Sequence, residues 1–293
     1  MMSTETILVT GATGGLGSKI VSSLLQKAPQ AKVIAGVRNP EKAAALAAKG
    51  AEVRLLDYDK PDTIDAALKG VTRVVLVSGN DVGRRVPQHK AVIDAARRAG
   101  VKLLGYTSIL RATESPLLLA QEHRGTEEVL AASGLAHILL RHGWYTENST
   151  NSAPLAVKFG VVQSCAGDGR FSTATRQDFA DGDATLILKE GHAPGQRYEL
   201  AGSTSFSRGE YAALLSRMSG SPVKYQPMSQ PDFTAALVAA GLPPPIANII
   251  SDSDAGASKG WLQDDSRTLE KVLGRPTTPL EKVVEETLKE TRT

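Results

Sequence analysis

The sequence predicts an α/β protein built on a doubly wound parallel sheet. Three observations lead to this fold class: the first half repeats short apolar runs, alanine-rich amphipathic stretches separate them, and glycines stand just before several of the runs. Short β-branched runs of this kind are typical of parallel strands buried on both faces. Strands that alternate with helices at this spacing form parallel sheets with helices on both sides.

The predicted strands and helices follow one another with little intervening chain. The apolar runs are ILVT at 7–10, KVIAGV at 32–37, EVRLL at 52–56, RVVLVS at 73–78, KLLGYTS at 102–108 and AHILLR at 136–141. Helices are predicted between them over 17–28, 40–49, 61–69, 87–99 and 116–133. Gly50, Gly70 and Gly100 stand where a helix C-cap requires a positive φ, which supports these helix ends.

After residue 144 the alternation stops, which predicts a second, smaller and mostly helical C-terminal lobe. Residues 145–175 are rich in Ser, Thr, Asn and Gly and predict loops. Helices are predicted over 177–190, 207–219, 231–240 and 278–291, and strands over 197–202 and 223–227. We therefore expect one domain at 1–150 and a smaller lobe at 151–293, some of whose segments return to the first sheet.

Composition excludes several classes of protein. Of the 293 residues, 41% are hydrophobic and 22% charged, a balance typical of globular chains. With 4% aromatic residues and a formal net charge of +3, we expect no nucleic-acid partner. The single cysteine, Cys165, excludes an internal disulfide and a cysteine-rich metal site, and we expect no metal. No signal peptide or membrane-spanning run is recognisable, so we expect a soluble, cytoplasmic protein that does not contact a membrane.

The strongest functional signal is the turn TGATGGLG at residues 10–17. It follows the first strand and opens the first helix, the context in which spaced glycines indicate a dinucleotide-binding turn. Gly11 allows the tight turn, Gly14 lets the backbone approach a pyrophosphate, and Gly17 lets the helix pack closely on the sheet. An ordinary glycine turn is the alternative. The turn residues expected to bind the cofactor are Gly11, Ala12, Thr13, Gly14, Gly15 and Leu16.

The end of the second strand indicates which dinucleotide is preferred. An Asp or Glu there would hydrogen-bond the ribose hydroxyls of NAD(H), but the chain has Arg38, followed by Lys42 one turn further on. A guanidinium can hold a 2′-phosphate through two parallel hydrogen bonds, and Lys42 adds a point charge. We therefore expect NADPH as the cofactor, with NADH bound more weakly. A solvated surface arginine is the alternative.

Three further strand ends are expected to line the same crevice, because open α/β sheets bind ligands at the carboxyl ends of their strands. The third strand ends where it should meet the adenine, and the fourth ends in small residues that leave room for the dinucleotide. Ordinary loop chemistry is the alternative for each. The residues expected to contact the cofactor here are Asp57, Ser78, Gly79, Asn80 and Thr107.

The sequence lacks the catalytic pair of ordinary short-chain dehydrogenases. No tyrosine has a lysine four residues later, so a Tyr-x-x-x-Lys pair is absent. The helix that should carry it instead places His123 and Glu127 on one face, at i and i+4. His123 could donate a proton near neutral pH, or it could be a structural histidine paired with Glu127; the structural interpretation is slightly favoured.

A series of motifs runs along nearly the whole chain in a fixed order. Besides the glycine turn they are VRNPEKA at 37–43, PQH at 87–89, AGVKLLGYTS at 99–108, LLRHGWYTEN at 139–148, CAGDGRFSTATRQDFA at 165–180, YELAG at 198–202 and DSDAGASKG at 252–260. Together they resemble the NmrA-like family of atypical short-chain dehydrogenases, most closely its type 2 NAD(P)H:quinone oxidoreductases, with the triphenylmethane-dye reductases as a sister group. The resemblance implies a Rossmann-like domain for NADP(H) and a small lobe over the nicotinamide.

The same resemblance implies direct hydride transfer to a quinone without a tyrosine–lysine pair. It implies that the phosphates lie at the glycine turn and Arg38, and that a short segment borders the nicotinamide. That segment comprises His142, Gly143, Trp144, Tyr145, Thr146 and Glu147; its first residue departs from the asparagine common in relatives. Trp144 and Tyr145 are expected to form a wall for a flat acceptor, with ordinary packing as the alternative.

Two functions of different classes remain open. The first is an enzyme that reduces quinones, in which Trp144, Tyr145 and His123 are the candidate catalytic residues. The second is a redox sensor that binds NADP(H) and reports its state to a protein partner. The missing tyrosine–lysine pair favours the sensor, and the retained tryptophan–tyrosine segment favours the enzyme. Dyes or other conjugated molecules are an alternative class of acceptor. The sequence indicates no oligomeric state.

Overall fold

The computed structural model describes residues 5–290, which form two compact units. The first unit consists of the chain up to Ala112 together with Glu122–His142 and Arg176–Leu200. The second consists of Thr113–Gln121, Gly143–Thr175 and the chain from Ala201 onward. Each unit is thus assembled from separate stretches of chain. The expected division into a domain at 1–150 and a lobe at 151–293 remains a prediction.

A parallel sheet forms the centre of the first unit and confirms the predicted α/β class. Its strands are β1 (Thr6–Val9), β2 (Lys32–Val37), β3 (Glu52–Leu55), β4 (Arg73–Leu76), β5 (Leu103–Ile109), β6 (His137–His142) and β9 (Gln196–Leu200). They lie in the order β3-β2-β1-β4-β5-β6-β9, and every neighbouring pair is parallel. The first three strands are added toward one edge of the sheet, and from β4 onward strands are added on the other side of β1. Doubly wound sheets bind ligands at this switch point between β1 and β4.

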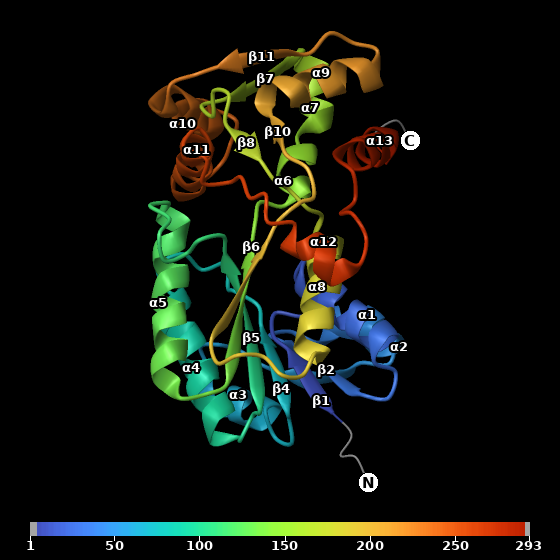
Figure 1. The fold of residues 1–293 in the computed structure, drawn as a ribbon, viewed down its shortest axis with the longest axis vertical. Coiled ribbons are helices and arrows are strands. Elements are labelled where there is room, and N and C mark those ends of the chain that lie inside the picture. The colour runs from blue at the N-terminus through green and yellow to red at the C-terminus, as the bar shows by residue number, and fades with distance from the viewer. Residues whose placement is uncertain (1–4, 291–293) are drawn as a thin grey trace. The chain divides into compact units, whose positions relative to one another are not determined.

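Helices cover both faces of this sheet (Figure 1). On one face lie α1 (Gly17–Lys27), α2 (Ala44–Ala48) and α8 (Arg176–Leu188), and on the other lie α3 (Pro61–Ala67), α4 (Arg85–Arg98) and α5 (Leu118–Ser133). The single helix predicted over 40–49 is in fact a 3-10 helix, η1 (Pro40–Ala43), followed by α2. The Asn39 side chain accepts a hydrogen bond from Glu41 N at 3.0 Å and starts this tighter turn.

An apolar core fills the space between the sheet and helices α3, α4 and α5. Its fully buried members include Leu8, Ile34, Ile64, Leu68, Val74, Leu76, Val92, Ile93, Leu104 and Leu130. Burying each of these side chains contributes roughly 1.5–3 kcal/mol relative to leaving it in water. The core therefore holds the strands in register and fixes the positions of the loops that leave their carboxyl ends.

The second unit is mostly helical, as predicted. Its helices are α6 (Thr146–Thr150), α7 (Ala153–Phe159), α9 (Arg208–Ser219), α10 (Gln230–Ala239), α11 (Pro244–Ala257), α12 (Thr268–Leu273) and α13 (Leu280–Glu290). Strand β7 (Val161–Ser164) pairs in parallel with β11 (Lys224–Pro227), and β8 (Arg170–Phe171) pairs in antiparallel with β10 (Phe206–Ser207). The predicted end of the last helix, Thr291, lies outside the described residues.

Several elements of the second unit differ from the sequence prediction. The segment 145–175, predicted as loops, contains α6, α7, β7 and β8. That prediction is wrong because β7 and β8 pair with strands far along the chain, and local composition does not report such partners. Helices α11 and α12 were not predicted at all. The prolines at 243–245 resemble a chain break, but a proline fits the first turn of a helix such as α11.

The motif DSDAGASKG, at the end of α11, links parts of the second unit. Asp252 Oδ2 accepts a hydrogen bond from Leu118 N at 2.8 Å, at the start of α5. Asp254 pairs with Arg208 at 2.9 Å. A Cβ atom at Gly256 would lie 2.3 Å from a methyl carbon of Leu117, so glycine allows the close approach. The motif therefore has a structural role in this unit.

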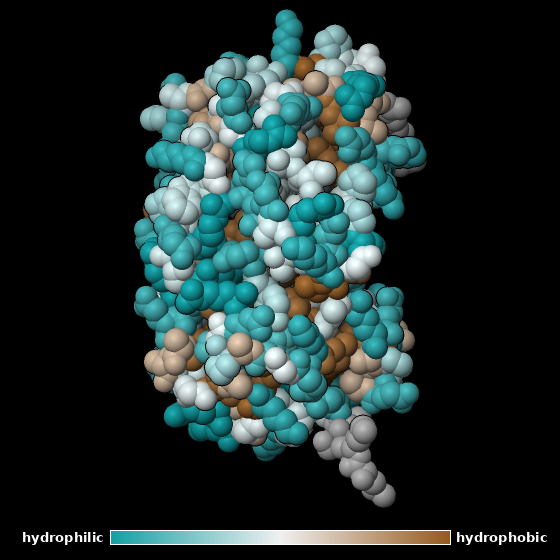
Figure 2. Space-filling view, viewed as in Figure 1, coloured by the Kyte–Doolittle hydropathy of each residue, from teal (hydrophilic) through white to brown (hydrophobic). Residues whose placement is uncertain are grey.

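The surface is polar and mixed in character. Hydrophilic residues cover most of the face drawn in Figure 2, and apolar residues form small separate areas on it. The exposed large apolar side chains are Leu55, Val82, Leu118, Leu155, Phe159, Val238 and Ile246. Within residues 5–290, no helix is long and apolar enough to cross a membrane, and no cluster of three or more His, Cys, Asp or Glu could hold a metal ion.

Candidate functional site

The glycine turn joins β1 to α1 at the switch point of the sheet. Gly11 has φ +56°, a conformation that favours glycine. A Cβ atom at Gly17 would lie only 2.5 Å from the carbonyl oxygen of Gly11, so no side chain fits where α1 meets the turn. Ala12 and Leu16 are buried, whereas the residues between them are exposed. The outer surface of the turn therefore consists largely of backbone, as contact with a pyrophosphate requires.

A polar cluster below the turn joins the ends of three strands. Thr10 Oγ1 accepts a hydrogen bond from Val77 N at 2.9 Å, and the hydroxyl of Tyr58 lies 2.7 Å from Thr10 Oγ1 and 2.9 Å from Val77 O. Burial raises the pKa of Tyr58 well above its usual value, so its hydroxyl remains protonated. The neighbouring Asp57 accepts a hydrogen bond from Asp59 N at 3.2 Å and shapes the turn after β3.

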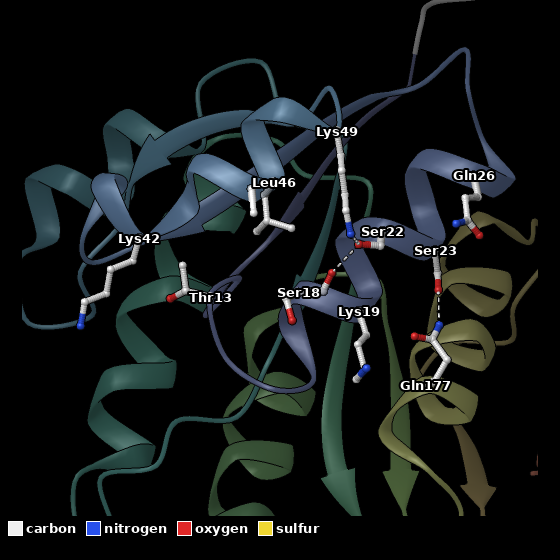
Figure 3. A pocket seen from close by; sticks show the side chains of 11 residues that line it. Thr13, Ser18, Lys19, Ser22, Ser23, Gln26, Lys42, Leu46, Lys49 and Gln177 are labelled. Atoms are coloured by element: carbon white, nitrogen blue, oxygen red, sulfur yellow. Dashed lines mark hydrogen bonds between the residues drawn. The ribbon is translucent and has the colours of Figure 1, made fainter. Parts of the chain in front are cut away.

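Arg38 and Lys42 lie on the exposed loop and 3-10 helix that follow β2. Arg38 forms no ion pair within residues 5–290. Between α1 and α2 is a groove of about 530 Å³ that is lined by three lysines, Lys42 among them, and by no acidic residue. Figure 3 shows Thr13 and Lys42 at one end of this groove and Gln26 and Gln177 at the other. The Thr13 end offers a hydroxyl and a cation to a phosphate group.

Two side chains of α4 hold the peptide groups of Gly79, just beyond β4. Gly79 N donates to His89 Nε2 at 3.0 Å, and Arg85 Nε donates to Gly79 O at 2.7 Å. Because His89 Nε2 accepts, its Nδ1–H must donate to Thr126 Oγ1, 2.9 Å away. Burial, and then the charge of Arg85, lowers the pKa of His89 to about 3, which keeps this imidazole neutral.

The sequence did not indicate the roles of Arg85 and His89. Their spacing of four residues on a helix, next to the PQH motif, was the available signal. A further hydrogen bond, from Ser78 N to Thr107 Oγ1 at 2.9 Å, fixes the preceding residue. Three of the predicted cofactor-binding residues, Ser78, Gly79 and Thr107, are therefore brought together at the ends of β4 and β5.

His123 and Glu127 do not pair with each other, so the expected pairing is wrong. His123 Nδ1 lies 2.9 Å from the hydroxyl of Tyr106. Glu127 accepts hydrogen bonds from Ser108 Oγ at 2.6 Å and from Arg141 Nη2 at 2.6 Å. Burial lowers the pKa of His123 well below its ordinary value. The neutral, buried imidazole favours a structural interpretation over that of a proton donor.

His142 ends β6 and is turned toward α8. Its Nε2 lies 2.8 Å from Asp183 Oδ1, and its ring stacks on Phe179 with 4.5 Å between ring centroids. Its carbonyl oxygen accepts a hydrogen bond from Leu110 N at 3.0 Å. Burial raises the pKa of the Asp183 carboxyl. The imidazole therefore anchors the end of β6 to α8, and a direct contact with the cofactor remains a prediction.

The residues after His142 belong to the second unit. Ala174 N donates to Trp144 O at 3.3 Å, and Thr146 N donates to Ala174 O at 2.9 Å, so this segment runs alongside residues 173–175 of its own unit. Trp144 and Tyr145 are half-buried. The roles predicted for Gly143, Trp144, Tyr145, Thr146 and Glu147 next to the nicotinamide therefore remain predictions.

Comparison with known proteins supports the dinucleotide assignment. Residues 11–187 match the model of a family described as NAD(P)H-binding. The chain is 50% identical to Quinone oxidoreductase 2 of Escherichia coli (strain K12), over 94% of this chain and 96% of that protein. The structure also resembles that of an NADPH-dependent quinone oxidoreductase of E. coli in complex with NADPH, with a TM-score of 0.93 and 48% identity over 96% of this chain and 99% of the other.

Two further similar proteins are a triphenylmethane reductase and an azoreductase. The triphenylmethane reductase of Citrobacter sp. has a structure with a TM-score of 0.91 and 36% identity, covering 97% of this chain and 99% of that chain. An NAD(P)H azoreductase of Xenophilus azovorans is 32% identical over 92% of this chain and 93% of its own length. The expected family resemblance is thereby confirmed. The chain belongs to the NAD(P)H-binding, NmrA-like family of oxidoreductases.

Proposed function

We propose that this protein is an NADPH-dependent reductase that delivers two electrons to a quinone as a hydride. The observation that carries the proposal is the 50% identity to Quinone oxidoreductase 2 of E. coli along 94% of the chain. The exposed Arg38 and the lysine-lined groove support the choice of NADPH over NADH, because cations and hydroxyls suit a 2′-phosphate.

The residues of the first unit fit a bound dinucleotide. The turn at 11–16 would hold the pyrophosphate, and Arg38, Lys42 and Thr13 would hold the 2′-phosphate. Asp57 and the segment 78–80 would border the adenosine half, with Thr107 fixing Ser78. When bound, NADPH supplies the hydride. The protein itself has to supply orientation and a fixed set of backbone contacts.

The proposed reaction needs no strong acid from the protein. A quinone is a strong two-electron oxidant, and water can protonate the modestly basic oxygen of the reduced product. A neutral His123 is compatible with this chemistry, and we propose that Trp144 and Tyr145 orient the flat acceptor. Removing His123 should therefore alter stability more than it alters the rate of reduction.

Stopped-flow mixing of NADPH-loaded protein with a small quinone tests the proposal. We expect a rapid loss of reduced-nicotinamide absorbance that saturates with quinone and is faster with NADPH than with NADH. Tight NADPH binding without oxidation by several quinones and dyes would contradict the enzyme and leave the redox-sensor alternative.

Dyes are a second candidate class of acceptor. The similarity to the triphenylmethane reductase of Citrobacter sp. and to the azoreductase of X. azovorans favours this class. The same stopped-flow measurement with a triphenylmethane dye in place of the quinone separates the two. The class of acceptor with the higher kcat/KM would be the one that the site prefers.

A further inference from the structure

Four arginines are buried among the residues that the structure describes, and they are Arg73, Arg85, Arg141 and Arg208. A buried guanidinium is costly unless carboxylates and other acceptors satisfy its donors. Three of the four meet this requirement through a carboxylate at hydrogen-bond distance: Arg73 with Glu5 at 3.1 Å, Arg141 with Glu127 at 2.6 Å, and Arg208 with Asp254 at 2.9 Å.

Arg85 differs from the other three because no carboxylate lies at hydrogen-bond distance from it; Arg208 also has a buried nitrogen without a partner, Nε, but it keeps Asp254 at 2.9 Å. Its Nε donates to Gly79 O at 2.7 Å, but its Nη1 is buried and has no hydrogen-bond partner within residues 5–290. The carboxylate that comes near it, Glu122, places Oε2 3.9 Å from Nη1, which is too far for a hydrogen bond. The other oxygen of Glu122 accepts from Gly83 N at 2.8 Å and from Arg85 N at 3.3 Å, so the backbone holds this carboxylate in place.

The position of Arg85 points to a ligand. Gly79 follows β4, next to the switch point where sheets of this topology bind their ligands. The side chain keeps 10% of its surface exposed, so the guanidinium is not fully closed off from the surface of the unit. A buried donor left without an acceptor costs roughly 1–3 kcal/mol, and more when it is charged, which favours an acceptor that arrives with the ligand.

We propose that Arg85 binds a negatively charged oxygen of a ligand held at the carboxyl end of β4. Its Nε would keep Gly79 in place while Nη1 donates to the ligand. Two sources carry this chemistry: the pyrophosphate of the dinucleotide, and the oxygen that becomes negative when the acceptor is reduced. The choice of these ligands rests on the proposed function.

The variant Arg85→Met tests the proposal, because methionine fills a similar space without charge. If Arg85 serves a ligand, the ligand-free protein should unfold at the same temperature as the unmodified protein or at a higher one. Binding should weaken by about ten- to a hundredfold, as expected for loss of a charged hydrogen bond. Arg85→Lys keeps a cation and should recover part of the affinity that Arg85→Met loses.

Arg84→Ala is the matched control. Arg84 is the preceding residue and carries the same charge, but its side chain is 62% exposed and pairs with Asp59 at 2.7 Å. Removing this charge should leave binding nearly unchanged. A loss in Arg84→Ala as large as that in Arg85→Met would mean that general charge near the site is responsible, and it would overturn the proposal.

Two measurements identify the source of the oxygen. The Kd of NADPH, measured by fluorescence without any acceptor, should rise in Arg85→Met if the pyrophosphate is the ligand. If the acceptor is the ligand, this Kd should stay constant while kcat/KM for 1,4-benzoquinone falls at saturating NADPH. Unchanged values in both measurements, with a lower unfolding temperature, would show a purely structural role and overturn the proposal.

Failure of this inference is distinguishable from failure of the proposed function. The unmodified protein either oxidises NADPH with quinone or does not, and that result judges the proposed function alone. The dinucleotide measurement judges Arg85 even if no acceptor reacts.

Discussion

Two buried arginines, Arg208 in the second unit and Arg85 in the first, differ in how their charge is compensated. In the second unit, Arg208 donates to Asp254 at 2.9 Å and to Ser149 at 2.8 Å, and its guanidinium lies 4.1 Å from the centre of the Phe171 ring. In the first unit, Arg85 has no carboxylate within hydrogen-bond distance. Arg208 thus has a carboxylate partner in its own unit, although its Nε has no hydrogen-bond partner, whereas Arg85, unlike Arg73 and Arg141 of the same unit, has no carboxylate at hydrogen-bond distance.

The largest effect on stability is expected when a buried ion pair loses its carboxylate. Asp254→Ala leaves Arg208 buried without its carboxylate, which should lower the free energy of unfolding by about 3–5 kcal/mol. Urea unfolding followed by circular dichroism measures the loss. The folded fraction should bind NADPH with nearly unchanged Kd, because the residues proposed to hold its phosphates lie in the first unit.

Asp252→Ala is the control for this change, since it makes the same substitution in the same helix. It removes only the hydrogen bond to Leu118 N and should cost about 1 kcal/mol, as the loss of a helix cap does. Equal losses in the two variants would contradict the assignment of Asp254 as the partner of a buried charge.

Removing an exposed cation of the first unit should instead weaken cofactor binding and leave stability nearly unchanged. Arg38→Ala should raise the Kd of NADPH by about ten- to a hundredfold, the loss of one or two charged hydrogen bonds, and leave that of NADH nearly constant. Because Arg38 is exposed and forms no ion pair within residues 5–290, the free energy of unfolding should hardly change. Equal weakening of both dinucleotides, measured by fluorescence titration, would count against the 2′-phosphate role.

A smaller effect on stability is expected from acid, and it arises in the first unit. Burial holds the pKa of His89 at about 3 in the folded protein, against about 6.5 when unfolded. The unfolded chain therefore binds the extra proton first, so this stability is complete above pH 6.5 and is lost as the pH falls toward 3. The free energy of unfolding should drop by about 1.4 kcal/mol per pH unit for this histidine.

His89→Gln provides the comparison for the acid effect. Glutamine can accept from Gly79 N through its side-chain oxygen but does not titrate. Urea unfolding between pH 7 and pH 5 should give a shallower dependence on pH in this variant than in the unmodified protein. Identical slopes would show that His89 takes up the same number of protons in the folded and unfolded states, which would contradict its lowered pKa.

Features encoded locally could be predicted from the sequence. Most strands of the large sheet are short apolar runs, and the glycine turn and Arg38 were identified from their positions just after two of these strands. In the second unit, the strand predicted over 223–227 corresponds to β11, but its partner β7, about 60 residues earlier, lies in the segment predicted as loops. The elements of the first unit could be predicted because its strands and helices alternate regularly, not because the unit is larger.

The site residues that were missed depend on contacts between distant segments. His89 holds Gly79 and contacts Thr126, so its role requires β4, α4 and α5 to be placed together first. The pairing expected between His123 and Glu127 used only their spacing on one helix. The strands below that helix supply stronger partners, Tyr106 for the histidine and Arg141 for the glutamate.

The smallest expected effect lies in the lysine-lined groove. Lys42→Ala should weaken NADPH by a few-fold, because an exposed ammonium contributes about 0.2–1 kcal/mol to an ion pair. Lys49→Ala is the matched control, since Lys49 lines the same groove but donates to Ser22 Oγ at 3.2 Å (Figure 3). If Lys42 faces the 2′-phosphate, its variant should lose more affinity than the Lys49 variant at low salt. The difference should shrink toward 1 M salt, where the screening length falls to about 3 Å. A difference that persists there would indicate a direct hydrogen bond, and equal losses would indicate a diffuse positive potential along the groove.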